Sequence, residues 1–241
     1  MLPIVILAGG FATRLGAQTK NLPKSLIPIN GIPFIKLQLD DLKAKGITKV
    51  HLCLGHFGEL VRDFVGDGSN FGLEISYTFD GTLPRGTAGA LFQAAEILKQ
   101  DLGVIYGDSF LPIGIGPIED YFLTDPAQAL MVVIKNQNQW ETSNVDYSLG
   151  KVHKYEKGDN SSSFEFVDYG LSYFTMAALS EFKDLTLPID LSFIMNRLAK
   201  QGKLSGYEVH QRFYEVGSYS GQSDFINFLG GKHGIHQETF E

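Results

Sequence analysis

Apolar and polar residues follow two periods that take turns along the first half of this chain. Short apolar or alternating runs, typical of strands, occupy residues 5–8, 49–55, 73–79 and 102–106. Between them, apolar residues recur every three or four positions, as on one face of a helix, over residues 34–42, 57–64 and 87–99. Such alternation of strands and helices is typical of parallel sheets covered by helices. We therefore expect an α/β fold, a single Rossmann-like domain with a mostly parallel central sheet and helices on both faces.

The second half of the chain has a different pattern, in which strand-like segments follow one another closely. They cover residues 129–134, 151–156 and 164–174. We expect these segments to add antiparallel strands to the sheet, with a hairpin tip in the polar residues 158–163. Helical patterns return at residues 189–200 and 218–229. No internal repeat and no linker rich in Pro, Gly and Ser appears, so residues 1–241 are expected to form one domain with two lobes, 1–125 and 126–241.

The composition excludes several functional classes. With 241 residues, 44% of them hydrophobic, the chain is long enough to bury one sizeable core. It has neither an apolar run near the ~20 residues that span a bilayer nor a signal-peptide pattern, so we expect a cytoplasmic protein without membrane contact. A formal charge of −7 argues against nucleic-acid binding, which needs a basic surface. Cys53 is the only cysteine, which excludes a disulfide within the chain, and the oligomeric state stays open, a homo-oligomer included.

The first strand runs into a glycine turn that carries several cations. Gly9 and Gly10 allow close approach of the backbone, so that amide donors can point at an anion, and Arg14, Lys20 and Lys24 supply positive charge. The glycine spacing fits neither the P-loop nor the dinucleotide fingerprint. We interpret the segment as a binding loop for a triphosphate.

The same segment resembles the signature of sugar-phosphate nucleotidylyltransferases, also called NDP-sugar pyrophosphorylases, with most similarity to heptose 1-phosphate guanylyltransferase-like members. In that signature Leu-Ala-Gly-Gly-x-Gly-Thr-Arg-Leu precedes Pro-Lys, and residues 7–15 and 23–24 match it, except that Ala12 replaces the third glycine. The resemblance implies a nucleotide-binding loop formed by Leu7, Ala8, Gly9, Gly10, Thr13 and Arg14. It also implies that Arg14 and Lys24 act on the reacting phosphates.

Two further segments match the family in the expected order. Residues 83–90, Leu-Pro-Arg-Gly-Thr-Ala-Gly-Ala, resemble the element that opens a helix beside the nucleotide, which assigns Pro84, Gly86 and Thr87 to nucleotide binding. Thr87 is also a candidate cap of that helix. The strand 104–109 then delivers Asp108, which the resemblance implies as a catalytic residue and a ligand of Mg²⁺, a hard cation that prefers carboxylate and phosphate oxygens.

Later segments resemble the sugar-phosphate side of the family's site. The implied substrate-binding residues are Tyr106, Asn144, Glu156, Lys157, Asp168 and Gly170. Glu215 stands where the family usually has a second metal-binding Asp, and we expect Asp108 and Glu215 to reach the same end of the sheet and share Mg²⁺. Two alternatives stay open, namely that Lys157 belongs to a solvated basic strand and that Glu215 pairs with Arg212.

The resemblance implies an enzyme that joins a sugar 1-phosphate to the α-phosphorus of a nucleoside triphosphate and releases pyrophosphate. Residues 1–125 would form the nucleotide-binding lobe and residues 126–241 the sugar-phosphate-binding lobe. A heptose or another precursor of a surface polysaccharide is the favoured acceptor, and the nucleobase is left open. The alternatives are transfer to a non-sugar phosphate and a regulatory subunit that binds nucleotide sugars without catalysis.

Overall fold

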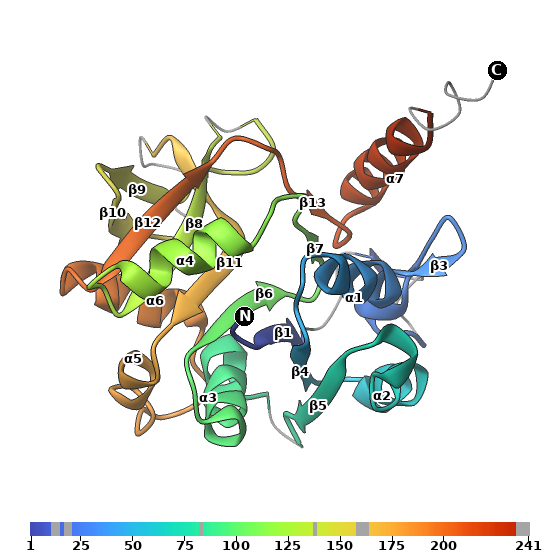
Figure 1. Cartoon of the computed structure of the whole chain (residues 1–241), viewed down its shortest axis with the longest axis horizontal. Helices are drawn as coiled ribbons and strands as arrows, with labels where there is room; N and C mark the ends of the chain where they lie inside the picture. Colours follow the sequence, from blue (N-terminus) through green and yellow to red (C-terminus); the bar gives the residue numbers. More distant parts are fainter. Residues whose placement is uncertain (11–14, 17–20, 82–83, 137–138, 158–163, 235–241) are drawn as a thin grey trace.

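A computed structural model shows a nine-stranded sheet with helices packed against it (Figure 1). It describes residues 1–10, 15–16, 21–81, 84–136, 139–157 and 164–234. The predicted hairpin tip at residues 158–163 lies outside the described residues, as do Ala12, Thr13, Arg14 and Lys20.

The main sheet and its helices account for most of the described chain. The sheet strands are β1 (Ile4–Ala8), β4 (Lys49–Leu54), β5 (Glu74–Phe79), β6 (Leu102–Tyr106), β8 (Ala129–Lys135), β9 (Val145–Ser148), β10 (Lys151–Tyr155), β11 (Phe166–Phe174) and β12 (Leu204–Val209). The helices are α1 (Phe34–Ala44), α2 (Gly58–Val65), α3 (Gly86–Leu98), α4 (Gly116–Thr124), α5 (Met176–Ser180), α6 (Leu191–Lys200) and α7 (Tyr219–Gly234). Two-residue strands form two small sheets, β2 (Pro28–Ile29) with β3 (Ile32–Pro33) and β7 (Ser109–Phe110) with β13 (Tyr214–Glu215). Short 3₁₀ turns cover η2 (Lys24–Leu26) and η3 (Ser69–Phe71).

The strand order is β5-β4-β1-β6-β11-β8-β12-β10-β9. The four strands from the first half of the chain, β5, β4, β1 and β6, pair in parallel. β11 then lies antiparallel between β6 and β8, and β12 is parallel to β8. At the far end β10 is antiparallel to both β12 and β9. The sheet is therefore mixed, and the expectation of a mostly parallel sheet fits its first half better than its second.

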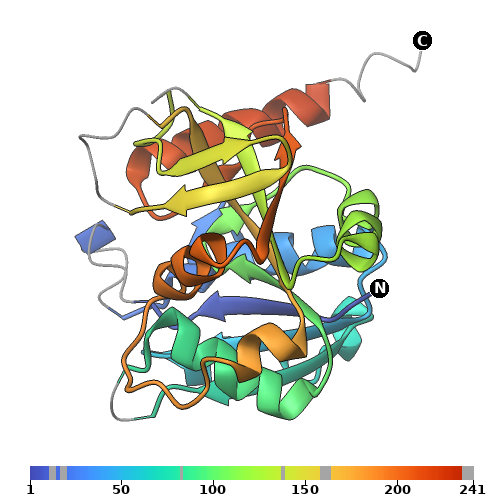
Figure 2. The ribbon, with the colours of Figure 1, turned by 90° about the vertical axis from the view of Figure 1, so that its left-hand side faces the viewer.

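Alternate residues of β1 show how the core is divided between the two faces of the sheet. Ile4 and Ile6 pack with the apolar side chains of α1, α2 and α4. Val5 and Leu7 point the other way and pack with those of α3, α5 and α6. Figure 2 shows α4 and α6 on opposite sides of the strands. Successive side chains of a strand point to opposite faces, so the uninterrupted apolar run of β1 is what burial on both faces requires.

The parallel strands place their C-terminal ends at one end of the sheet, where Gly9 follows β1, Asp80 follows β5 and Asp108 closely follows β6. Ligands of open α/β sheets bind at this end. Within the described part of the chain, none of the helices combines the length and apolar character needed to cross a membrane.

Candidate active site

Lys24, Asp108 and Glu215 come together from three distant parts of the chain. Lys24 begins the 3₁₀ turn η2, and Asp108 stands between β6 and β7. Glu215 reaches the site through the pairing of β13 with β7, in which it lies opposite Ser109, and the N–H of Val216 donates to the Asp108 carbonyl over 2.9 Å. Glu215 thus arrives through this small sheet and not, as expected, at the end of a strand of the main sheet.

The three charged groups converge beside Gly217. The Lys24 Nζ lies 2.7 Å from the Asp108 Oδ2. A Cβ atom placed on Gly217 would lie 2.7 Å from this Nζ, 3.0 Å from the Asp108 Oδ2 and 2.9 Å from the Glu215 Oε2. Any side chain at position 217 would collide with these three charged groups, so the site requires glycine there.

The Glu215 carboxylate is held by the turn that precedes α7. It accepts hydrogen bonds from the N–H of Gly217, over 2.5 Å, and from the hydroxyl of Ser218. The alternative in which Glu215 pairs with Arg212 is wrong, because Arg212 forms its ion pair with Asp224.

The donor chemistry of this cluster fits a hard divalent cation. Asp108 and Glu215 each bring a carboxylate oxygen to within 3.0 Å of the same point, and Mg²⁺ takes one or two carboxylates together with phosphate oxygens and water. No group of three or more His, Cys, Asp and Glu side chains arranged for a metal is found among the described residues. The described residues would therefore supply two carboxylate ligands to such a metal ion.

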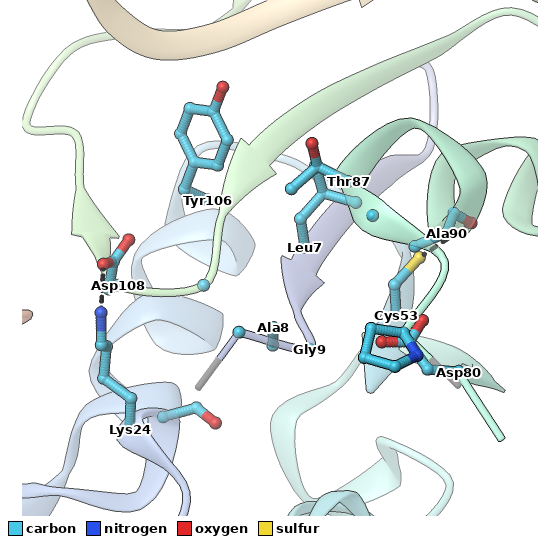
Figure 3. Close-up of a pocket in the computed structure, with 15 residues that line it drawn as sticks. Leu7, Ala8, Gly9, Lys24, Cys53, Asp80, Thr87, Ala90, Tyr106 and Asp108 are labelled. Atoms are coloured by element: carbon cyan, nitrogen blue, oxygen red, sulfur yellow. Dashed lines mark hydrogen bonds and ion pairs between the residues drawn. The ribbon is translucent and has the colours of Figure 1, made fainter. Parts of the chain in front are cut away.

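A pocket of about 280 Å³ lies over the C-terminal ends of the parallel strands. The predicted nucleotide-binding residues that the structure describes all line it: Leu7, Ala8, Gly9, Gly10, Pro84, Gly86 and Thr87. We call it the nucleotide pocket below, after those predictions. Lys24 and Asp108 lie at one end of it, and Cys53 and Asp80 lie at the other (Figure 3). The predicted contacts of Thr13 and Arg14 fall outside the described residues.

The start of α3 is built around Gly86. Its φ is +75°, a conformation that residues with a side chain rarely adopt. In addition, a Cβ atom there would lie 2.3 Å from the carbonyl oxygen of Ile189, so both the backbone conformation and the available space require glycine. Thr87 does not cap α3 as expected. Its hydroxyl accepts from the N–H of Leu191 over 2.6 Å and donates to Asp190, the residue whose carboxylate caps α6. The nucleotide pocket is thereby tied to α6 of the second half of the chain.

A second pocket, of about 770 Å³, adjoins the first and is called the acceptor pocket below, after the predicted substrate-binding residues that line it. Of the predicted substrate-binding residues, it is lined by Tyr106, Asn144, Lys157, Asp168 and Gly170. Glu156 is not among the residues that line it; its carboxylate pairs with Lys154 at 2.8 Å. Tyr106 and Asp108 line both pockets, so the two pockets share a wall.

Asp168 organises the polar wall of the acceptor pocket. Its carboxylate accepts from the hydroxyl of Tyr155 at 2.9 Å, from that of Tyr106 at 3.4 Å and from the N–H of Gly170 at 2.9 Å. Burial and the negative charge of Asp168 raise the pKa of both tyrosines well above its usual range, so both hydroxyls stay protonated as donors. Asn144 completes the network by accepting from the N–H of Asp168 at 3.1 Å. Asp168 is only 8% exposed, and most of its contacts are with the protein. It therefore holds the two tyrosine side chains in place as well as lining the pocket.

Lys157 extends over this aromatic wall. Its Nζ lies 5.0 Å from the centre of the Tyr106 ring, 3.3 Å from the Tyr106 hydroxyl and 3.9 Å from Asp190. With its side chain 42% exposed, Lys157 stands at the mouth of the pocket, where a mobile ammonium group can meet an incoming anion. The neighbouring Lys154 is similarly exposed but pairs with Glu156.

Trp140, Glu141 and Arg212 are among the residues of the acceptor pocket that were not predicted from the sequence. The Arg212 guanidinium lies 5.5 Å from the centre of the Trp140 ring and 5.1 Å from that of Tyr214. Burial, followed by the charges of Asp168 and Glu215, raises the pKa of Glu141 to about 7. Trp140 is the single tryptophan of the chain, which is the one signal that could have drawn attention to this segment.

Comparisons with known proteins give the same picture of the fold. A crystal structure from Bacillus anthracis superposes with a TM-score of 0.84 at 22% identity, and the superposition covers 95% of both chains. The inositol-1-phosphate CTP transferase from T. maritima has a TM-score of 0.80 at 18% identity and likewise 95% coverage of both chains. At these identities the comparison establishes the fold.

Relatives are also found by sequence. A low-salt glycan biosynthesis nucleotidyltransferase of Haloferax volcanii is 33% identical over 159 residues, which are 64% of this chain and 44% of that protein. A D-glycero-alpha-D-manno-heptose 1-phosphate guanylyltransferase of Campylobacter jejuni is 32% identical over 115 residues, or 48% of this chain and 51% of that protein. A glucose-1-phosphate thymidylyltransferase of Streptomyces antibioticus is 31% identical over 180 residues, or 72% of this chain and 49% of that protein. The chain thus spans about half the length of these relatives.

The family itself is established by a match that extends through most of the fold. Residues 4–179 match the nucleotidyl transferase family, a stretch that includes the glycine turn after β1, Lys24, Asp108 and the Asp168 network. With the shared fold and the two adjoining pockets, this match shows that the chain belongs to the nucleotidyl transferase family.

Proposed function

We propose that this protein transfers a nucleotidyl group from a nucleoside triphosphate to a sugar 1-phosphate and releases pyrophosphate. The observation that carries the proposal is the pair of pockets that share Tyr106 and Asp108, with the Lys24 ammonium at their junction. A reaction between two phosphate esters needs this arrangement, because both substrates must present their phosphates to one point. Family membership and the names of the sequence relatives support the same reaction class.

The nucleotide pocket has the features that a triphosphate requires at its charged end. Gly9 and Gly10 bring backbone close to the ligand, and Lys24 supplies a positive charge beside them. We assign Lys24 to the reacting phosphates, and we assign Arg14, on the evidence of its sequence position alone, to the triphosphate.

The acceptor pocket suits a phosphorylated polyol. Hydroxyl and amide groups of Tyr106, Tyr155 and Asn144 offer hydrogen-bond partners to hydroxyl groups, and Lys157 meets the phosphate at the mouth. A volume of about 770 Å³ falls within the usual range of ligand pockets and accommodates a heptose as well as a hexose. A heptose or another polysaccharide precursor is our preferred acceptor because the sequence resembles heptose 1-phosphate guanylyltransferases.

The chemical step needs no general base. An oxygen of the sugar phosphate is already anionic at neutral pH; it attacks the α-phosphorus, and the bond from that phosphorus to the bridging oxygen of the β-phosphate breaks. Lys157 would orient the attacking phosphate, and Lys24 would stabilise the charge that develops between the two substrates. Asp108 and Glu215 would hold Mg²⁺, which supplies Lewis-acid neutralisation of phosphate charge when it is bound. Because nucleoside triphosphates are cytoplasmic substrates, we assign the reaction to the cytoplasm.

A pyrophosphate-release screen tests the proposal. Purified protein with Mg²⁺ is combined with each of GTP, ATP, CTP, UTP and dTTP and with a panel of hexose, heptose and inositol 1-phosphates. Mass spectrometry then identifies the second product. We expect pyrophosphate and an NDP-sugar in equal amounts with at least one pair, and loss of both in Asp108→Asn. Tight binding of an NDP-sugar without turnover would favour the regulatory alternative, and a product only with inositol phosphate would favour a non-sugar acceptor.

A further inference from the structure

Asp80 places a carboxylate in the nucleotide pocket at the end away from Lys24. It directly follows β5, and its N–H donates to the carbonyl of Leu54 over 2.9 Å, which fixes the backbone. Its Oδ2 would lie 2.9 Å from a Cβ atom placed on Gly9, so the carboxylate rests against the glycine turn. Figure 3 shows Asp80 on one side of Ala8 and Gly9, with Lys24 and Asp108 on the other.

This carboxylate has no hydrogen bond or ion pair with the parts of the chain that the structure describes. Asp80 is half-buried, and burial raises the pKa of its carboxyl group above the usual value, although the positive charge of Arg85 opposes part of this rise. A carboxylate that is taken partly out of water without a donor is unfavourable, and an ionised carboxylate can only accept hydrogen bonds. Asp80 therefore favours a ligand that brings donors to this end of the pocket.

The proposed function says which part of the ligand lies there, and the inference rests on it. The phosphates belong beside Lys24 and the glycine turn, and the nucleobase is the opposite end of the same molecule. Gly9 lies against Asp80, and small or flat residues such as Pro84 and Gly86 also line the pocket, which leaves space for a planar ring. The donors that Asp80 meets are then those on the hydrogen-bonding edge of the base.

We infer that Asp80 reads the nucleobase and selects guanine. Guanine presents two adjacent donors, the ring N1–H and the exocyclic amine, which a carboxylate can accept in parallel with its two oxygens. Adenine and cytosine present one amine beside a ring acceptor, and uracil and thymine present one N–H flanked by carbonyls. In these four bases an acceptor faces a carboxylate oxygen, so repulsion against the wrong base adds to the attraction for the right one.

Similarity to other proteins does not decide this question. The relatives named above include both a guanylyltransferase and a thymidylyltransferase at almost the same identity. The base has to be inferred from residues of this chain, and Asp80 is an acidic group that the structure brings to the base end of the pocket.

Binding of triphosphates without an acceptor tests the inference directly. Isothermal titration calorimetry compares GTP with ATP, CTP, UTP and inosine triphosphate, which differs from GTP only in lacking the exocyclic amine. A good bidentate pair discriminates by about 10- to 100-fold. We expect GTP to bind at least tenfold more tightly than every other triphosphate, inosine triphosphate included. In Asp80→Asn the ratio of GTP to inosine triphosphate affinity should fall to one or below, because the new amide opposes a donor to the guanine amine.

Glu74→Gln is the matched control. It removes one negative charge from the other end of β5, where Glu74 pairs with Lys49 on the surface, and it should leave the ratio unchanged. Equal binding of GTP and inosine triphosphate by the unmodified protein overturns the inference even if Asp80→Asn does not fold. If another triphosphate is bound as tightly as GTP and still supports pyrophosphate release, the base assignment is wrong and the proposed function survives. If no triphosphate binds, both are wrong.

Discussion

Replacement of Lys24 by Ala removes the positive charge at the junction of the two pockets. In the structure its Nζ lies 2.7 Å from the Asp108 Oδ2, with the Lys24 side chain 22% exposed and that of Asp108 30% exposed. If Lys24 stabilises the reacting phosphates, loss of a preorganised charge contact lowers turnover by about 10²- to 10³-fold, or about 2.7–4 kcal/mol. The effect on folding should be far smaller, because a partly exposed ion pair contributes at most about 1 kcal/mol, or roughly 2–4 °C in melting temperature for a chain of this size.

Steady-state pyrophosphate release and thermal unfolding measure the two effects separately. Lys36→Ala is a suitable control, since Lys36 pairs with Asp40 on α1 at 2.8 Å but both side chains are more exposed and lie outside the pockets. The control should keep normal turnover. Every nucleoside triphosphate shares the same phosphates, so Lys24→Ala should reduce turnover with all of them by a similar factor. Turnover within a few-fold of normal in a folded Lys24→Ala variant, or a loss confined to one triphosphate, would refute the assignment.

Three further predictions concern other parts of the molecule. Lys157→Ala should raise KM for the sugar phosphate by about 10- to 100-fold, the value of a charged hydrogen bond, and change KM for the triphosphate much less, as two-substrate kinetics will show. Glu215→Gln should raise the Mg²⁺ concentration needed for half-maximal turnover, and scanning calorimetry should show a melting temperature lower by a few degrees, because the carboxylate accepts from Gly217 and Ser218. Burial lowers the pKa of His51 from 6.5 to about 4. Between these two pH values the unfolded chain binds a proton at His51 and the folded chain does not. The free energy of unfolding should therefore be unaffected by His51 above pH 6.5 and should decrease as the pH falls toward 4. NMR should find the His51 imidazole neutral at pH 5.5 in the folded protein.

The first half of the fold could be predicted because its information is local. Each of β4, β5 and β6 carries an apolar pattern of strand length, and the helix that follows or precedes it keeps one apolar face. β12 was missed because its sequence, Leu-Ser-Gly-Tyr-Glu-Val, has a central glycine and polar neighbours. Its place is set by a parallel pairing with β8, whose residues lie far away in the sequence. Gly206 itself is required, since a Cβ there would lie 2.5 Å from the Tyr147 ring.

The residues of the candidate site likewise fall into those that could be predicted from sequence and those that could not. Gly9, Lys24 and Asp108 follow a strand or stand in a recognisable short motif, so their position could be inferred from sequence. Trp140 and Arg212 lie between elements, in segments without periodicity, and become neighbours only when the chain returns after β12. The partners of Thr87 were likewise unpredictable, because Asp190 and Leu191 approach it only through the docking of α6.

The central position of β11 matters while the chain is being synthesised. β6 pairs with β1 on one side, but its neighbour on the other side, β11, begins only at Phe166. Until then the backbone groups along that side of β6 are unpaired, and an open strand edge is a template for pairing with other chains. At about 5–20 residues per second, a ribosome needs several seconds to make the intervening segment. We therefore expect a nascent chain to be prone to aggregation after β6 has been made and before β11 emerges to pair with it.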